Sequence, residues 1–162
     1  MKTASLSLLL GPLFLFGCQG KLDAAKLEKE IAATIEDQTD AKVESVTCPK
    51  ERPLKKGDEF TCDVEFEGGG DGEVAAEQTS DTGDVKYELE GAIIVPKTLE
   101  KKISEGLEEK GFANIEIDCG KKVRKAEEGD TFSCKAADDK GVERKIAVTV
   151  KDDDGNINWK VE

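Results

Sequence analysis

The stretch Gly57-Asp58-Glu59-Phe60-Thr61-Cys62 returns 72 residues later as Gly129-Asp130-Thr131-Phe132-Ser133-Cys134. Two further blocks return in the same register: Leu27-Glu28-Lys29-Glu30-Ile31 as Leu99-Glu100-Lys101-Lys102-Ile103, and Gly83-Asp84-Val85-Lys86-Tyr87 as Gly155-Asn156-Ile157-Asn158-Trp159. Only the first cysteines, Cys48 and Cys119, are 71 residues apart. Three matched blocks in one register indicate an internal duplication, with copies of about 70 residues.

Each copy begins with a predicted amphipathic helix. Apolar residues recur every four positions in both: Leu27, Ile31 and Ile35, then Leu99, Ile103 and Leu107. Asp23 can cap the first helix, Pro96 suits the first turn of the second, and Gly111 can end the second. We therefore expect one helix in each copy, with one apolar stripe facing a core.

Short strands follow each helix. Apolar side chains alternate in the second expected strand of both copies: Phe60, Cys62, Val64 and Phe66, then Phe132, Cys134 and Ala136. Asp154-Gly155 predicts a hairpin between the last two strands. Val74-Ala75-Ala76-Glu77 has weak strand propensity, and the glycine-rich loop Gly68–Gly72 is expected to be mobile. The interpretation is an α+β protein with two repeats, residues 23–90 and 91–162, each a helix on a four-stranded antiparallel meander.

Four cysteines lie within the two copies: Cys48, Cys62, Cys119 and Cys134. Four cysteines allow three pairings. The repeat symmetry favours Cys48–Cys62 and Cys119–Cys134, because the cysteines share parity with the expected core residues. Metal ligation is the alternative, but the chain has no histidine and no closely spaced cysteine pair, so we expect disulfides and no metal.

The first residues have the pattern of an export signal. One lysine precedes a mostly apolar run to Gly17, which is shorter than the roughly 20 residues that span a bilayer. Leu15-Phe16-Gly17-Cys18 resembles the lipobox of bacterial lipoproteins. We expect residues 1–17 to be a signal peptide and residues 18–22 to be a lipidated tether. In this interpretation Cys18 carries the lipid, which includes palmitate. The alternative is an ordinary signal peptide with an incidental cysteine.

This interpretation places the protein in a bacterial cell envelope, outside the cytoplasm and anchored to the membrane by lipid. Gln19 follows the lipidated position. By the sorting rule of Gram-negative lipoproteins, which this segment resembles, a residue other than Asp there indicates the outer membrane if the host is Gram-negative. Exported chains with an even number of remaining cysteines also commonly form disulfides.

The charge of the chain argues against nucleic acid as a partner. The formal net charge is −12, and a body this acidic repels DNA, RNA and bare anionic membrane. The two copies differ: residues 19–90 carry 9 basic and 20 acidic side chains, whereas residues 91–162 carry 14 and 16. The first copy is therefore the acidic one.

The sequence shows no evident set of catalytic residues. Without histidine, the usual base of serine and cysteine triads is missing, and the chain's 36 acidic residues supply carboxylate pairs by chance. Asp152-Asp153-Asp154-Gly155 faintly resembles a calcium loop, but Val150 would hold the first ligand position. We expect no enzyme activity, no catalytic residues and no cofactor, with a hairpin turn favoured over weak surface calcium binding.

A basic segment lies between the cysteines of each copy: Lys50, Arg52, Lys55 and Lys56, then Lys121, Lys122, Arg124 and Lys125. These segments are either solvated turns or loops that contact an anionic envelope component such as lipid headgroups. Between the copies, the segment Gly91–Pro96 is too apolar for a free linker. We therefore predict that Ile93 and Ile94 are buried between the copies and fix their orientation.

Val46-Thr47-Cys48-Pro49, then Gly57 and Phe60-Thr61-Cys62, resemble the pattern of a family of small bacterial envelope domains known as domain of unknown function 4333. The likeness covers most of residues 22–90. The second copy keeps Gly129, Phe132 and Cys134 but has Gly120 in place of the proline. The resemblance implies an envelope location and brings no activity with it.

The leading interpretation is a membrane-tethered binding or structural module whose partner is an envelope component or envelope protein. The alternative is a secreted inhibitor, because the tandem layout is similar to that of β-lactamase inhibitory proteins. Aromatic residues on an exposed sheet face would favour the inhibitor. Tyr87 and Trp159, the only Tyr and Trp, lie at matched positions that core packing explains equally well.

Overall fold

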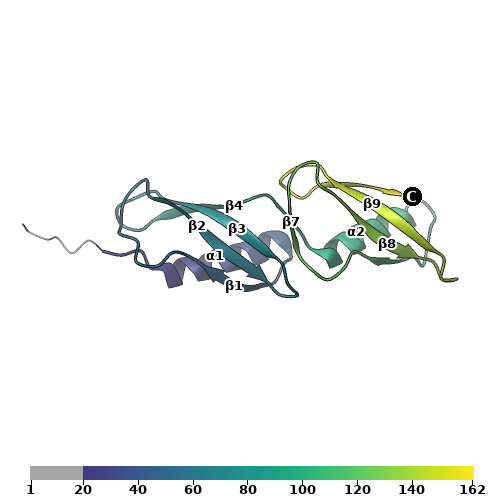
Figure 1. Cartoon of the computed structure of the whole chain (residues 1–162), viewed down its shortest axis with the longest axis horizontal. Coiled ribbons are helices and arrows are strands. Elements are labelled where there is room, and N and C mark those ends of the chain that lie inside the picture. The colour runs from purple at the N-terminus through teal and green to yellow at the C-terminus, as the bar shows by residue number, and fades with distance from the viewer. Residues whose placement is uncertain (1–19) are drawn as a thin grey trace, which may run out of the picture.

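The computed structural model describes residues 20–162, which form two units placed end to end (Figure 1). The expected signal peptide and Cys18 lie outside the described residues. The chain is an α+β protein with two helices and antiparallel sheets, as the sequence predicts. We call the unit that contains the first helix repeat one and the unit that contains the second helix repeat two.

Repeat one is a helix on a four-stranded sheet. Helix α1 (Ala24–Thr39) is followed by β1 (Val43–Thr47), β2 (Glu59–Phe66), β3 (Asp71–Gln78) and β4 (Val85–Leu89). The strands are antiparallel in the order β1-β2-β3-β4, which is a simple meander.

Repeat two has a similar sheet and an additional strand pair. Its elements are β5 (Ala92–Ile94), α2 (Pro96–Glu108), β6 (Glu116–Asp118), β7 (Arg124–Ala126), β8 (Thr131–Ala137), β9 (Glu143–Val150) and β10 (Ile157–Val161). The main sheet has the order β10-β9-β8-β6, whereas β7 pairs with β5 in a separate two-stranded sheet. This separate pair, which sequence patterning did not predict, joins the segment between the repeats to the loop between the cysteines.

Both helices form for the expected reasons. The side chain of Asp23 accepts a hydrogen bond from the backbone N–H of Lys26 at 3.0 Å, which caps α1. Pro96 begins α2, where its missing N–H has no cost. The predicted stripes are confirmed, because all six residues are buried: Leu27, Ile31, Ile35, Leu99, Ile103 and Leu107.

The expected strand around Val74-Ala75-Ala76-Glu77 forms despite its weak strand propensity. Strand β3 runs over eight residues with perfect alternation of buried and exposed side chains. It is the third of four strands and pairs with β2 over residues 71–77 and with β4 over residues 74–78. Hydrogen bonds on both edges and the burial of Val74 and Ala76 against the core override the low propensity of alanine.

Each repeat has its own apolar core and its own disulfide. Cys48 is bonded to Cys62 and Cys119 to Cys134, closing sequence separations of 14 and 15 residues. The pairing favoured by the repeat symmetry is therefore the one in the structure. All four cysteines are buried, so the disulfides join the loop entrances to the core strands β2 and β8.

Candidate functional site

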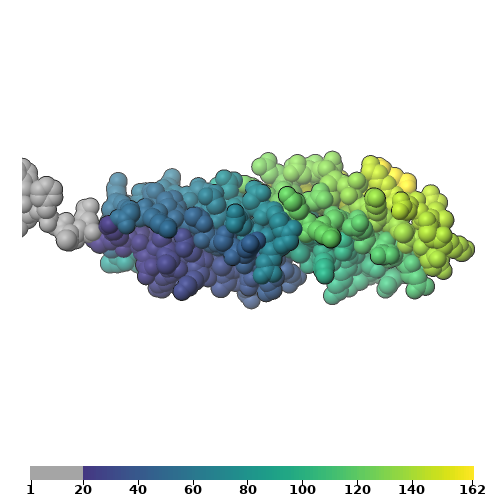
Figure 2. Space-filling view, turned by 60° about the horizontal axis from the view of Figure 1, so that its bottom comes forward, coloured from purple at the N-terminus to yellow at the C-terminus, as the bar shows by residue number. Residues whose placement is uncertain are grey.

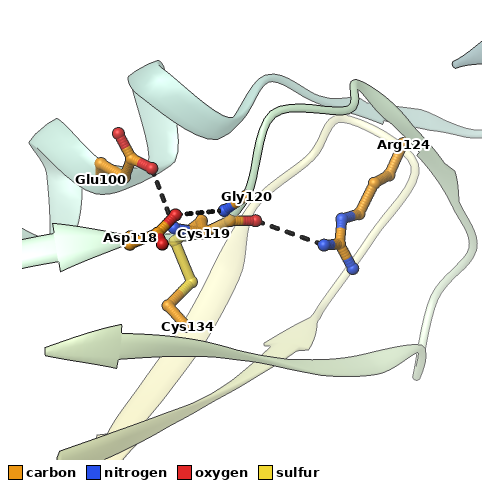
Figure 3. The surroundings of a disulfide bond; sticks show 6 residues. All are labelled: Glu100, Asp118, Cys119, Gly120, Arg124 and Cys134. Carbon is orange, nitrogen blue, oxygen red and sulfur yellow. Dashed lines mark hydrogen bonds between the residues drawn. A yellow bond between two sulfur atoms is a disulfide. The ribbon is translucent and has the colours of Figure 1, made fainter. Parts of the chain in front are cut away.

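The loop between the two cysteines is held in the same way in both repeats. In repeat two, the Glu100 carboxylate on α2 accepts a hydrogen bond from the backbone N–H of Cys119 at 2.8 Å, and Asp118 accepts one from Gly120 at 2.8 Å (Figure 3). In repeat one, Glu28 on α1 accepts the equivalent bond from Cys48 at 3.0 Å. Helix, disulfide and loop entrance are thus locked together.

The arginine of each loop is engaged within its own repeat. Arg52 lies over the ring of Phe60 and Arg124 over the ring of Phe132, with guanidinium carbons 4.8 and 4.9 Å from the ring centres. Arg124 also donates to the carbonyl of Cys119 at 3.2 Å (Figure 3). These two predicted anion-contacting residues therefore brace the loops.

Arg52 has a further partner in Asp58, 2.7 Å away. Asp58 also accepts a hydrogen bond from the side chain of Gln78, which is fully buried. The hydrogen bond from Arg52, together with that from Gln78, lowers the pKa of Asp58, and the bond to Asp58 raises the pKa of Arg52. This network closes the base of the first loop.

The lysines of the first loop lie at the free end of repeat one. Lys50, Lys55 and Lys56 are exposed. Beside them, Leu22 donates its backbone N–H to Arg52 and Leu54 donates to Gly20, both at 2.9 Å. The last part of the expected tether, Gly20–Leu22, is therefore bonded to the first loop through an isolated β-bridge between Lys21 and Pro53.

The second loop lies at the junction between the repeats. Its β7 pairs with β5 in the register Ala92 with Ala126 and Ile94 with Arg124. The pair Gly20–Leu22 and Arg52–Leu54 occupies the equivalent place in repeat one, 72 residues earlier. The end of the repeat that carries the loop between the cysteines is thus free in repeat one and docked in repeat two. The two basic loops therefore do not converge.

Val123 and Lys125 attach the second loop to repeat one. Val123 is buried and belongs to the apolar core of repeat one. The Nζ atom of Lys125 lies 2.7 Å from Glu73 and 3.5 Å from Glu90. The hydrogen bond to Glu73 has the largest effect in raising the pKa of Lys125, and Glu90 adds to it. Lys121 and Lys122 remain exposed. The second basic segment therefore serves the junction in part.

The glycine-rich segment Gly68–Gly72, which is expected to be mobile, contacts repeat two. The backbone N–H of Val123 donates to the carbonyl of Gly69 at 3.0 Å, and Gly72 lies within β3. Gly70 has a φ of 111°, and a Cβ at this position would overlap the carbonyl oxygen of Val123. The three consecutive glycines allow the backbone of repeat two to approach that of repeat one closely.

The prediction that Ile93 and Ile94 are both buried between the repeats is confirmed in part. Ile94 is buried in the core of repeat two, and Ile93 is half-buried and packs against the core of repeat one. Because side chains alternate along β5, this short strand contributes to both cores. Figure 2 shows repeat one (purple to teal) and repeat two (green to yellow) in direct contact as one elongated molecule.

Tyr87 and Trp159 face the helices of their repeats. The hydroxyl of Tyr87 lies 2.9 Å from that of Thr34 on α1, and the ring of Trp159 is close to Gly106 on α2. Lys110 lies over the Trp159 ring, 4.4 Å from its centre. Both aromatic residues therefore cover the cores and do not line an open sheet face.

The acidic side chains of the described residues do not converge on a metal-binding arrangement. Among residues 20–162, no three or more His, Cys, Asp or Glu side chains are grouped so that they could hold a metal ion. The Asp152 carboxylate accepts bonds from the backbone and side chain of Asn156 at 3.0 and 2.9 Å, which lower the pKa of Asp152 and form the predicted hairpin turn. In this same part of the chain, no helix is long and apolar enough to cross a membrane.

Comparison with known proteins identifies one family. The family model described as domain of unknown function (DUF4333) matches residues 5–83 and again residues 88–155. No curated protein and no solved structure matches the chain. Since the two matches together cover most of the chain and coincide with the two repeats, the protein belongs to the DUF4333 family and contains two copies of its domain.

Proposed function

We propose that this protein is a non-enzymatic lipoprotein of a bacterial envelope, in which a lipid on Cys18 tethers a two-repeat rod that serves as a binding or structural module. In this proposal residues 1–17 are the signal peptide that directs export. The envelope partner of the protein would bind the part of the rod that is far from the anchor.

The observation that carries the proposal is the position of Gly20–Leu22. This segment is bonded to Arg52–Leu54 at the end of repeat one opposite repeat two. Cys18 is only two residues earlier in the sequence. A lipid on Cys18 would therefore hold this end close to the bilayer and direct repeat two away from it.

The charges at this end fit an anionic membrane better than the rest of repeat one does. Lys50, Lys55 and Lys56 are exposed beside Gly20, and Lys21 pairs with Glu51. Each unpaired lysine near an anionic surface contributes about 1 kcal/mol, so three of them can offset part of the repulsion from the acidic repeat. We assign the lipid-facing role to the first basic loop only, because the second lies at the junction.

The tether is tested by intact mass spectrometry of the protein purified from membranes of its native host. The expected chain begins at Cys18 and carries a diacylglyceryl group. The Cys18→Ser variant should lose that mass and leave the membrane fraction. A native chain that begins at Met1, or that lacks lipid, contradicts the proposal.

The lipid-facing loop is tested with the unlipidated Cys18→Ser form and vesicles that contain phosphatidylglycerol. Changing Lys55 and Lys56 to Gln should lower co-sedimentation at low salt. Changing Lys121 and Lys122 to Gln is the matched control, because these lysines are also exposed but lie at the junction. Equal losses for both sets would assign the effect to net charge and not to this end of the rod.

A further inference from the structure

The end of repeat two that is far from repeat one contains an apolar hollow of about 450 Å³. Six apolar side chains line it: Leu107, Phe112, Ile115, Ala136, Val142 and Val161. Phe112, Val142 and Val161 are 59, 48 and 46% exposed and are the large apolar side chains that stand out as exposed among residues 20–162. Exposed apolar area thus gathers at one place, next to an opening in the core.

The hollow has a cause in the duplication. Position 138 of repeat two corresponds to position 66 of repeat one, where Phe66 is only 1% exposed and fills the end of the core. Asp138 instead accepts hydrogen bonds from the backbone N–H groups of Lys140 and Val142 at 2.9 and 2.8 Å. Repeat two therefore lacks the aromatic ring that closes its counterpart.

A second exchange adds a cation beside the opening. Gly72 lies against the ring of Phe66 in repeat one, where an added Cβ would be 3.2 Å from the ring. Its counterpart is Arg144, which lines the hollow and has no ion-pair partner within residues 20–162. The ring and the glycine of repeat one are thus replaced by the Asp138 carboxylate and the Arg144 guanidinium, and both line the hollow beside its apolar side chains.

The same end of repeat one is covered by repeat two, but a third repeat cannot cover the hollow in the same way. Docking requires Gly70, whose place beneath Val123 leaves no room for a side chain. The corresponding residue of repeat two is Val142. The occupant of the hollow is therefore different from a further repeat.

We propose that this hollow is a recognition site for a protein segment that inserts an aromatic side chain, with an acidic residue beside it. Phe66 shows the size of group that completes this core, and Arg144 supplies the charge for a neighbouring carboxylate. The proposal goes beyond the membrane tether and does not depend on it. It assigns the partner-binding surface to the end of the rod farthest from Gly20.

The experiment uses the full chain with Cys18→Ser, labelled with ¹⁵N and with both disulfides formed. The probe is the peptide acetyl-Gly-Asp-Phe-Asp-Gly-amide, titrated while amide chemical shifts are recorded. We expect saturable shifts at Phe112, Ile115, Val142 and Arg144. The peptide with Ala in place of Phe should bind at least about tenfold more weakly, because it lacks the buried ring.

Three variants test the site itself. Asp138→Phe restores the residue of repeat one and should abolish the shifts by filling the hollow, and Ala136→Leu should do so without altering the turn. Arg144→Gln should weaken binding roughly two- to fivefold, as expected for an exposed charge pair. Both filling variants must keep the dispersed amide spectrum of repeat two away from the hollow, which separates a filled site from an unfolded repeat.

Three results would overturn the proposal. The first is the absence of saturable shifts at the distal end. The second is equal binding of the Phe and Ala peptides, or binding that Asp138→Phe and Ala136→Leu leave unchanged. The third is saturation of the hollow by decanoate or by a second copy of the chain when the peptide has no effect, since either would assign a different occupant.

Discussion

Gly70 and Val123 meet backbone to backbone at the junction: a Cβ on residue 70 would lie 3.0 Å from the carbonyl carbon of Val123 and overlap its oxygen. This contact joins a hairpin loop of one repeat to the loop between the cysteines of the next. The relative orientation of the repeats therefore depends on a position that tolerates no side chain.

Gly70→Ala should separate the repeats. The substitution adds a clash with the main chain of Val123 to the strain of a non-glycine residue at a φ of 111°, a strain of about 1–3 kcal/mol. NMR relaxation should show two units that tumble independently, whereas the unaltered chain tumbles as one body. Gly68→Ala is the control, because its φ of 85° carries similar strain but its nearest contact is 3.4 Å away. Equal behaviour of the two variants would remove the close approach as the cause.

Val123→Ala should destabilise repeat one, although the residue belongs to repeat two. Its buried side chain packs in the core of repeat one, so its truncation should cost about 1–3 kcal/mol there. Hydrogen exchange resolved by residue would show faster opening of β2 and β3. A loss confined to repeat two would contradict the assignment of Val123 to the first core.

Removing either disulfide should be costly, and by similar amounts. Cys48→Ala with Cys62→Ala opens a separation of 14 residues, and Cys119→Ala with Cys134→Ala opens one of 15. Closing loops of this length stabilises a protein by about 3 kcal/mol in the chain-entropy description. Calorimetry should show the altered repeat unfolding at lower temperature. A pair of alanines that leaves the unfolding temperature unchanged would show that the core alone suffices.

Asp58→Asn should reduce the acid sensitivity of folding. Because Arg52 and Gln78 lower the pKa of Asp58 in the folded state, its contribution to stability is present above the unfolded pKa of about 4. That contribution is lost as the pH falls from there through the folded pKa. Guanidinium unfolding at pH 7 and pH 3 should therefore show a smaller difference for Asp58→Asn than for the unaltered chain.

Asp130→Asn is the matched control for this measurement. Asp130 holds the equivalent place in repeat two and accepts a bond from the backbone of Glu127, but no ion pair joins it to an arginine among the described residues. It should leave the pH dependence closer to that of the unaltered chain. If both variants change it equally, the arginine is not the cause.

The local features of the fold could be predicted because they depend on residues close in sequence. Periodicity located the buried stripe that begins at Leu27, and the Asp154-Gly155 turn located the last hairpin. The repeat register, combined with strand parity, identified the disulfide partners. These signals are independent of how the repeats contact each other.

The junction could not be predicted in the same way, because it depends on tertiary contacts between the copies. Gly68–Gly70 suggested mobility, yet the absence of side chains is what permits docking. Val123 was one apolar residue within a basic segment, which is the signal that could have revealed a buried contact. The exchange of Phe66 for Asp138 was likewise visible in the register, but its result, an open hollow, required the packing around it.

The Val142 side chain makes the order of the two repeats matter, which the duplicated sequence conceals. Repeat one offers a glycine socket to its neighbour, and repeat two does not. If the order of the two domains were transposed, the junction should therefore not form and the domains should be free to reorient, even though every residue of each domain would be retained.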